Sequence, residues 1–230
     1  MAKRRDSITA LLKRCDTDLK KIEQEYRDSL DRKQVRTDLQ VDIKNLCENL
    51  RSILDYIAHD IRETHSAGAD PRARFYFPIL ASKASFESSA KKWYPGLDVK
   101  VPDLWGYLES VQPYHSDWSW IGVFNRLTNA NKHSNLIAQK RTETPEVRAS
   151  SRNIVVNWKP ENVTFGPGVS IANVPIDPRT QMPVPDPSLK LERITWVDFR
   201  FESENVSALG LLKKALAGVG KIAADVEKWL

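Results

Sequence analysis

Apolar residues recur at steps of three and four positions through much of this chain, and this spacing predicts amphipathic helices. The clearest seam lies in residues 36–64, and the helix it predicts ends before Gly68 and Pro71. Residues 6–33 carry a second seam of this kind, so the two segments predict a long helical hairpin. The apolar residues of the seam in 36–64 are Leu39, Ile43, Leu46, Leu50, Ile53, Leu54, Ile57 and Ile61.

Shorter helices are predicted in the middle of the chain, where prolines mark their limits. The pattern favours helices over residues 83–93, from Pro102 to about 111, and over about 117–140. From about residue 205 the helical period returns. We expect this last seam to pack against the helix of residues 36–64, because neither apolar surface can remain exposed over such a length. The contacts expected are those of Leu209, Leu212, Leu216 and Val219 with Ile53 and Ile57.

Strand-like patterns replace the helical ones between residues 146 and 203. Strands are predicted over 154–158, 169–174 and 194–201, and the prolines of residues 175–187 argue against a central strand there. The fold class predicted is mainly α: a helical bundle with a small antiparallel β insertion. We expect a single domain, residues 1–230, made of a bundle (1–145), the insertion (146–203) and a C-terminal helix (204–230) that returns to the bundle.

The bulk composition narrows the classes of function. The 230 residues are 41% hydrophobic and 28% charged, which is typical of a soluble globular protein. The net charge of +5 favours polyanionic partners mildly. No apolar run approaches the roughly 20 residues of a membrane span, and no apolar segment follows the basic N-terminus as in a signal peptide. Cys15 and Cys47 form no CxxC pair. A cytoplasmic protein without membrane association is therefore expected.

The concentrated chemistry of the chain lies in residues 125–133, within one predicted helix. Arg126 and His133 are seven residues apart, so both point the same way, and Asn129 falls between them on that face. A cation that holds a phosphate, an amide that orients it and an imidazole that moves a proton suit metal-free RNA cleavage. The pattern alone is equally compatible with a solvated helix face. No metal-ligand spacing and no glycine-rich phosphate loop occurs, so neither a metal nor a cofactor is expected.

Small residues share the face of Arg126 and His133. They are Ser119, Gly122 and Ala130, and they would let another backbone approach this helix closely. The face therefore suits contact with a second copy of the chain.

Two resemblances rest on this region. Arg126 followed by six residues and His133 resembles the Arg-x(4–6)-His signature of the HEPN superfamily, helical-bundle proteins that include prokaryotic RNA-cleaving toxins and defence proteins. The chain is also similar to a group of bacterial and phage proteins, and this similarity implies no activity. The segments that carry it are Leu50–Tyr56, Phe77-Pro78-Ile79, Gln112-Pro113-Tyr114 and Asn131-Lys132-His133.

The HEPN resemblance implies a metal-independent endoribonuclease of toxin or phage-defence type that acts on RNA. An unidentified antitoxin or other protein is a further candidate partner. His133 would act as general base or acid, Arg126 would grip the scissile phosphate, and Asn129 would orient it. Asn131 and Lys132 would support RNA binding. In the family the site is composite, which implies a homodimer. HEPN nucleases usually carry a polar residue after the arginine, where this chain has Leu127. The alternative is a non-catalytic helical interaction or dimerisation protein.

A polar stripe on the second predicted helix is a further candidate site. Its members recur at three- and four-residue steps opposite the apolar seam, which favours a solvated face of ion pairs. The alternative is that Asp55 or His59 reaches His133 and fixes its tautomer. His65 and His115 are expected to be structural. The stripe consists of Glu48, Arg51, Asp55, His59 and Arg62.

Overall fold

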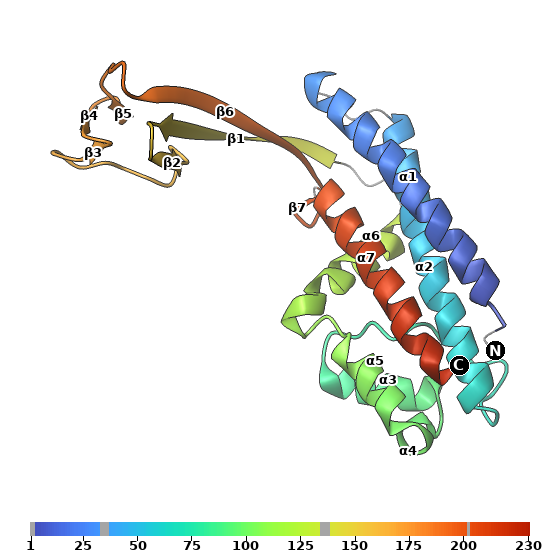
Figure 1. Ribbon diagram of the computed structural model, residues 1–230. Helices are drawn as coiled ribbons and strands as arrows, with labels where there is room; N and C mark the ends of the chain where they lie inside the picture. Colours follow the sequence, from blue (N-terminus) through green and yellow to red (C-terminus); the bar gives the residue numbers. More distant parts are fainter. Residues whose placement is uncertain (1–2, 33–36, 134–138, 202) are drawn as a thin grey trace. The chain divides into compact units, whose positions relative to one another are not determined.

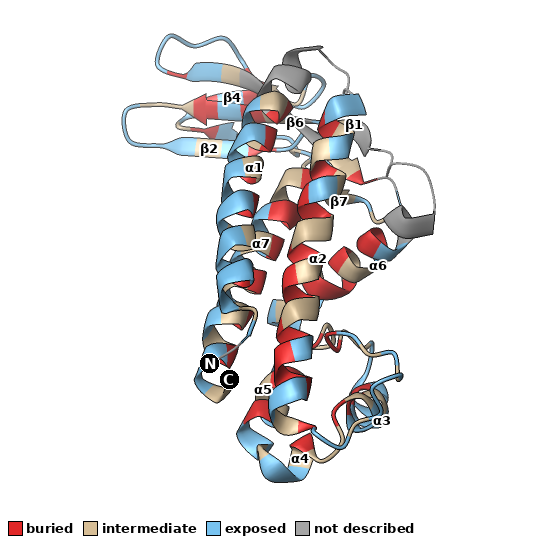
Figure 2. Cartoon of the chain, turned by 90° about the vertical axis from the view of Figure 1, so that its right-hand side faces the viewer, coloured by how far each residue is buried: buried red, intermediate tan, exposed pale blue. Residues whose placement is uncertain are grey.

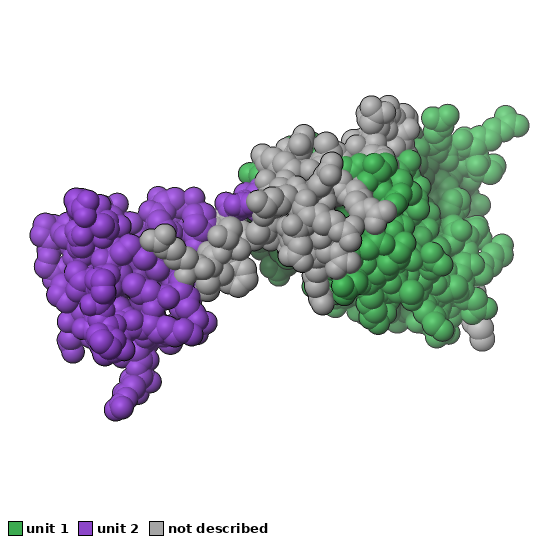
Figure 3. Space-filling view, turned by 90° about the horizontal axis from the view of Figure 1, so that it is seen from above, with its two compact units in different colours: residues 1–140, 199–230 green, residues 141–198 purple. Residues whose placement is uncertain are grey.

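A computed structural model of the protein describes residues 3–32, 37–133, 139–201 and 203–230. Within these ranges, the side chains of residues 27–32, 130–133, 139–141, 144 and 193–199 are outside the description. The chain divides into two compact units (Figure 3). The larger unit joins Met1–Lys140 to Phe199–Leu230, and the smaller is Arg141–Asp198. The sequence predicted one domain with an insertion of residues 146–203, a few residues from the limits of the smaller unit.

The larger unit is built of helices, as the mainly α prediction requires. Two of the predicted helices have almost the limits that their apolar spacing indicated, and the helix predicted over residues 83–93 has those limits in the structure. The helices are α1 (Arg5–Arg32), α2 (Thr37–His65), α3 (Lys83–Trp93), α4 (Leu97–Lys100), α5 (Pro102–Ser110), α6 (Ser119–His133) and α7 (Ala208–Val226), with 3-10 turns η1 (Ser116–Trp118) and η2 (Glu227–Trp229).

The core of this unit lies where α1, α2 and α7 pack on one another (Figure 1). Figure 2 shows buried positions concentrated along α2, in agreement with its narrow apolar seam. The predicted packing of α7 on α2 is confirmed, because the two helices are in contact and their seams belong to one apolar cluster. Leu212 and Val219 are fully buried, whereas Leu209 and Leu216 are only partly buried and Leu211 is buried beside them.

Helix α6, which carries the candidate chemistry, packs against both α2 and α7. Its position depends on Gly218 of α7: a Cβ built there would lie 2.2 Å from the Trp120 ring. Such a distance is far inside van der Waals contact, so only glycine lets α6 lie this close to α7. The ring of Trp120 and the apolar face of α6, which includes the fully buried Ile121 and Phe124, complete the core.

The described strands form two antiparallel sheets. One has the order β2-β1-β6-β7 and the other β3-β4-β5. Seven buried residues of the smaller unit, among them Val147 and Trp158, form an apolar cluster of their own. The strands are β1 (Gln139–Ser150), β2 (Val155–Trp158), β3 (Ser170–Ile171), β4 (Val174–Asp177), β5 (Met182–Pro183), β6 (Lys190–Phe201) and β7 (Val206–Ser207).

The structure corrects three predictions in this region. The helix predicted to about residue 140 is wrong at its end, because α6 is described to His133 and β1 begins at Gln139. The single strand predicted over 169–174 is two strands, since Ala172 and Asn173 adopt positive φ of 50° and 66° in a turn. Pro175 lies in β4, the middle strand of its sheet, where its carbonyl accepts from the Val184 N–H. The ladders that join β4 to β3 and to β5 have only two residue pairs each, so this short sheet tolerates the N–H donor that Pro175 lacks.

None of the helices in the described part of the chain is long and apolar enough to cross a membrane.

Candidate functional site

Arg126 lies on the exposed side of α6, with 61% of its side chain accessible to solvent. Its guanidinium is occupied by a carboxylate of the same chain. Nε donates to Glu204 Oε1 at 2.9 Å, and Nη2 donates to Glu204 Oε2 at 2.8 Å. Both oxygens of the carboxylate are therefore engaged in a bidentate pair, the geometry in which arginine also grips a phosphate.

Glu204 owes its position to the tight turn between β6 and β7. The Asn205 N–H donates to the Phe201 carbonyl at 2.8 Å, and Asn205 adopts a positive φ of 51°. This turn holds the Glu204 side chain at α6, with 18% of it exposed. The hydrogen bonds from Arg126 lower the pKa of Glu204, and the same bonds raise the pKa of Arg126. The free chain thus holds a charged carboxylate where the HEPN resemblance implies a phosphate.

Asn129 faces a different neighbour, the helix α2. It lines a pocket of about 300 Å³ together with Asn125, one helical turn earlier, and Arg51 of α2. Arg51 Nη1 donates to the Asn125 side-chain oxygen at 2.8 Å. Arg126 and Asn129, predicted to act on one phosphate, therefore turn to different surroundings in this structure.

Arg51 is buried, with only 9% of its side chain exposed. Besides Asn125, its neighbours are the Asp55 carboxylate, with Oδ1 3.4 Å from Nη2, and the ring of Tyr76, 5.9 Å from the guanidinium carbon. Among the described residues, Arg51 Nε has no hydrogen-bond partner. A buried cation with an unmet donor costs free energy, so the one charged side chain among the residues that line the pocket is incompletely satisfied.

Aromatic and apolar side chains close the rest of the pocket. Tyr76 and Trp93 stand edge to face with ring centroids 6.3 Å apart, and Phe77 and Ile79 complete the wall. Tyr76 is well exposed, at 45%, whereas Phe77 is buried. The pocket therefore combines two side-chain amides, one buried guanidinium and an accessible aromatic ring.

The remaining residues of the predicted motif are only partly covered by the structure. Asn131, Lys132 and His133 belong to the last turn of α6, but their side chains lie outside the described residues. Whether Asp55 or His59 reaches His133 therefore stays a prediction. The described contacts of these two residues are with Arg51 for Asp55 and with Phe75 for His59, whose ring centroids are 4.6 Å apart.

The polar stripe of α2 is not the solvated face that its pattern favoured. Arg51 and Arg62 are buried, at 8% and 7% exposure. Arg62 donates to the Asp70 carbonyl and lies over the Phe75 ring, 4.2 Å from its centroid. The segment after α2 folds back over these arginines and covers them. His59, in contrast, is exposed as expected for a solvated stripe.

The small-residue face of α6 is also corrected in part. Gly122 is buried against the chain itself, because a Cβ there would lie 2.9 Å from the Pro113 side chain. Its lack of a side chain is thus used within the protein and provides no evidence of a dimer contact. Ser119 is exposed, and the side chain of Ala130 is outside the described residues.

Other reactive side chains have structural surroundings. His65 Nε2 lies 2.7 Å from the Trp229 carbonyl, and His115 Nε2 lies 3.2 Å from Glu109 Oε1. Cys15 and Cys47 are free and buried, and burial raises the pKa of both thiols to about 12. They are therefore protonated and unsuited as nucleophiles at neutral pH. Within the described residues, no group of three or more His, Cys, Asp or Glu could hold a metal ion.

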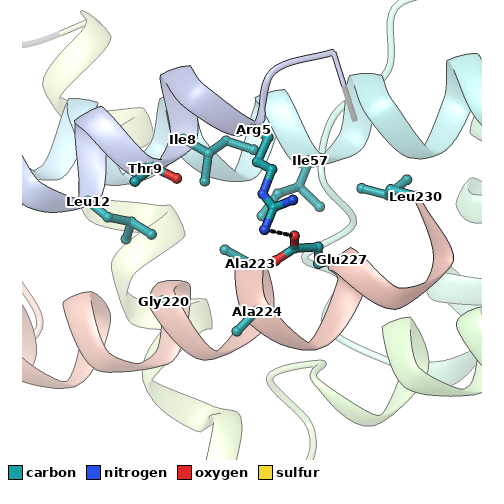
Figure 4. Close-up of a pocket in the computed structure, with 10 residues that line it drawn as sticks. All are labelled: Arg5, Ile8, Thr9, Leu12, Ile57, Gly220, Ala223, Ala224, Glu227 and Leu230. Carbon is teal, nitrogen blue, oxygen red and sulfur yellow. Dashed lines mark ion pairs between the residues drawn. The ribbon is translucent and has the colours of Figure 1, made fainter. Parts of the chain in front are cut away.

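A second pocket of about 210 Å³ lies between α1, α2 and the end of α7 (Figure 4). An ion pair between Arg5 and Glu227, 2.5 Å apart, crosses it (Figure 4). Its walls are mostly apolar, formed by residues such as Ile8, Leu12 and Ala223. Besides this pair, Thr9 is the only lining residue with a polar side chain, so the side chains of the pocket present little chemistry to a ligand.

The sequence analysis missed Glu204, and it included Arg51 only as a member of the α2 stripe, for which a solvated face was favoured. One signal for Arg51 was present: Cys47, Leu54 and Ala58 lie four before, three after and seven after it, which places Arg51 at the edge of the apolar seam. No local signal marked Glu204, because it lies 78 residues from its partner Arg126.

Comparison with known proteins identified no relative: no protein-family model, no curated protein and no solved structure matches the chain.

Proposed function

We propose that this protein is a HEPN-like RNA-binding protein whose α6 motif supports metal-independent endoribonuclease chemistry, in a prokaryotic toxin or phage-defence context. One observation carries the proposal: α6 presents a solvent-accessible guanidinium, Arg126, and an exposed amide, Asn129, on the helix that ends at His133. The net charge of +5 suits a polyanionic substrate.

The proposed chemistry needs no metal. His133 takes the proton of a ribose 2′-hydroxyl, the 2′-oxygen attacks the adjacent phosphorus, and the 5′-oxygen leaves and takes up a proton. An imidazole titrates near neutral pH and suits either proton transfer. Arg126 holds the phosphate and stabilises its developing charge. For this, the phosphate must displace the Glu204 carboxylate from the guanidinium fork.

In this proposal the working site is composite. One motif supplies one imidazole, and in-line cleavage benefits from an acid and a base on opposite sides of the phosphate. A two-fold axis beside α6 would provide both in a homodimer. Replacing Ala130 with Arg should then weaken dimerisation, and sedimentation at high micromolar concentration would detect it. A wild-type protein that stays monomeric there contradicts the composite site.

The test of cleavage is incubation of purified protein with total RNA in EDTA. We expect cleavage by the wild type and none by His133→Ala, since loss of a general acid–base group typically lowers the rate 10²- to 10⁴-fold. Arg126→Ala should behave similarly and Arg126→Lys should recover part of the rate, because lysine lacks the bidentate fork. Full activity of His133→Ala would remove this histidine from the mechanism.

A second candidate function is a non-catalytic interaction or dimerisation protein, with an antitoxin or other protein as partner. The observation that favours it is the Arg126–Glu204 pair, which leaves the motif arginine satisfied without a phosphate. In that case the wild type neither binds nor cleaves RNA in EDTA, and Glu204→Gln changes neither RNA binding nor cleavage.

A further inference from the structure

The pocket between α2 and α6 is a built site apart from Arg126, and Asn129 is the residue of the α6 motif that lines it. Its central side chain, Arg51, is more than nine-tenths buried and keeps one unpartnered donor, Nε, among the described residues. Two amides and three aromatic rings line the same space, which has a volume of about 300 Å³. A buried polar group without a partner requires an explanation, and a ligand that completes its hydrogen bonds is one.

We propose that this pocket receives one unstacked base of single-stranded RNA. This inference rests on the proposed RNA-binding function and names the form of RNA that the protein recognises. It assigns to the pocket the residues Arg51, Tyr76, Trp93, Asn125 and Asn129.

The two amides face the pocket from one side of α6. Asn125 and Asn129 are four residues apart and so lie one above the other on the helix. Arg51 donates to the Asn125 side-chain oxygen, which fixes the amide and leaves its N–H groups without a partner among the described residues. The exposed Asn129 adds a second donor and acceptor. The edges of bases offer matching donors and acceptors side by side.

The aromatic wall supplies the stacking surface. Tyr76 is held by its backbone, whose carbonyl accepts a hydrogen bond from the Tyr94 hydroxyl at 2.8 Å, while its ring remains accessible. Trp93 stands against it at an interplanar angle of 82°. Unpaired bases stack on such rings, whereas bases inside a duplex are already stacked and cannot enter.

The charge balance of the pocket favours a base over a bare phosphate. Asp55 Oδ1 lies 3.4 Å from Arg51 Nη2, so an anion that approached the guanidinium would meet a carboxylate beside it. A neutral base meets no such repulsion, and an acceptor on its edge can take the hydrogen bond that Arg51 Nε lacks among the described residues. Arg51 thus acts as a positioning residue for Asn125 and as part of the wall.

The test is binding of a fluorescein-labelled 12-nucleotide RNA with 2′-O-methyl riboses, which cannot undergo attack by the 2′-oxygen. Binding is measured by anisotropy in EDTA, for the single strand and for its duplex. Tyr76→Ala should weaken single-strand binding about tenfold, the effect typical of a lost base stack. Asn129→Ala should weaken it by about the same factor, because the base edge loses an amide that hydrogen-bonds it. Tyr76→Phe keeps the ring and should bind within about twofold of the wild type. Both positions are exposed, so the variants should fold, which circular dichroism checks.

Asn45→Ala provides the matched control, because Asn45 is an exposed amide on α2 outside this pocket. Wild-type binding that survives both Tyr76→Ala and Asn129→Ala unchanged overturns the base pocket and leaves the proposed function standing. Equal affinity for single strand and duplex overturns it as well. A wild type that binds neither form contradicts RNA binding itself, and the pocket proposal with it.

Discussion

Two arginines on adjacent helices of the same unit have opposite surroundings. Arg126 of α6 is largely exposed, yet its guanidinium is bound by both oxygens of Glu204. Arg51 of α2 is buried, yet its only hydrogen bond to a described residue goes to Asn125, and Nε has no partner there. Arg126, which the sequence predicted to be reactive, has both of its hydrogen bonds to a carboxylate of its own chain. Arg51, which was assigned to a solvated stripe, keeps a donor without a partner among the described residues.

The burial of a charged side chain decides whether its contacts contribute mainly to stability or remain available for binding. An exposed ion pair contributes little to folding, because water competes with it, and a phosphate can replace its carboxylate at small cost. A buried guanidinium has no water to replace a lost partner, so removing any one of its partners lowers the free energy of unfolding strongly. We therefore expect Arg51 to dominate stability and Arg126 to respond mainly to ligand and salt.

The largest expected effect is that of Arg51→Ala on the free energy of unfolding. The change leaves Asn125 beside a cavity and removes the cation next to Asp55, whose side chain is 31% exposed. The loss should therefore lie near the lower end of the roughly 3–5 kcal/mol that breaking a fully buried charge pair costs. Arg126→Ala should cost less than about 1 kcal/mol. Urea denaturation of the two variants measures the contrast. Equal losses would show that burial does not separate these arginines.

A double substitution sharpens the first prediction. Arg51→Met with Asp55→Leu removes both charges and keeps much of the side-chain volume, so most of the stability lost in Arg51→Ala should return. The residual loss should be below about 2 kcal/mol, because Asn125 still lacks its donor. The midpoints of urea denaturation of the single and double variants measure how much stability returns. If the double variant is as unstable as Arg51→Ala, the lost stability comes from packing and not from the unpaired Asp55 carboxylate.

A smaller effect is expected when Glu204 releases Arg126. In Glu204→Gln the guanidinium loses its anionic partner and is free for a phosphate, so affinity for single-stranded RNA should rise several-fold at about 50 mM salt. The dependence of log K on log salt should steepen by about 0.7, the contribution of one phosphate contact on a single strand. Anisotropy titrations over a salt series measure both quantities. Combining Glu204→Gln with Arg126→Ala should abolish the gain.

The smallest expected effect is a pH dependence of the Arg126–Glu204 pair. The folded protein lowers the pKa of Glu204, so the pair contributes stability above the pKa that Glu204 has in the unfolded chain. The contribution, below about 1 kcal/mol, is lost as pH falls through the lowered pKa of the folded state. Unfolding of the wild type and Glu204→Gln should therefore differ at pH 7 and converge in acid. A difference that persists at the acid end would contradict this assignment.

The helices were the part of the fold that the sequence determined. The limits of α2 and α3 follow from local apolar spacing, and the Ser82 hydroxyl that accepts from the Ser85 N–H is a local start signal for α3. The packing of α7 on α2 also followed, since two long apolar seams in one chain must cover each other. The strands were predicted less well: β1 was missed, and the Ala172–Asn173 turn divided a predicted strand.

The partner of each polar side chain, in contrast, depends on how the helices and turns pack together. The sequence by itself placed Arg126, Asn129 and His133 on one helix, because helical spacing is a local property. It could not show that the Glu204 carboxylate, held in a turn, would accept hydrogen bonds from Arg126. Nor could it show that the segment around Tyr76 and Phe77 would cover Arg51. Burial and pairing of charges depend on residues tens of positions away, and no local pattern encodes that distance.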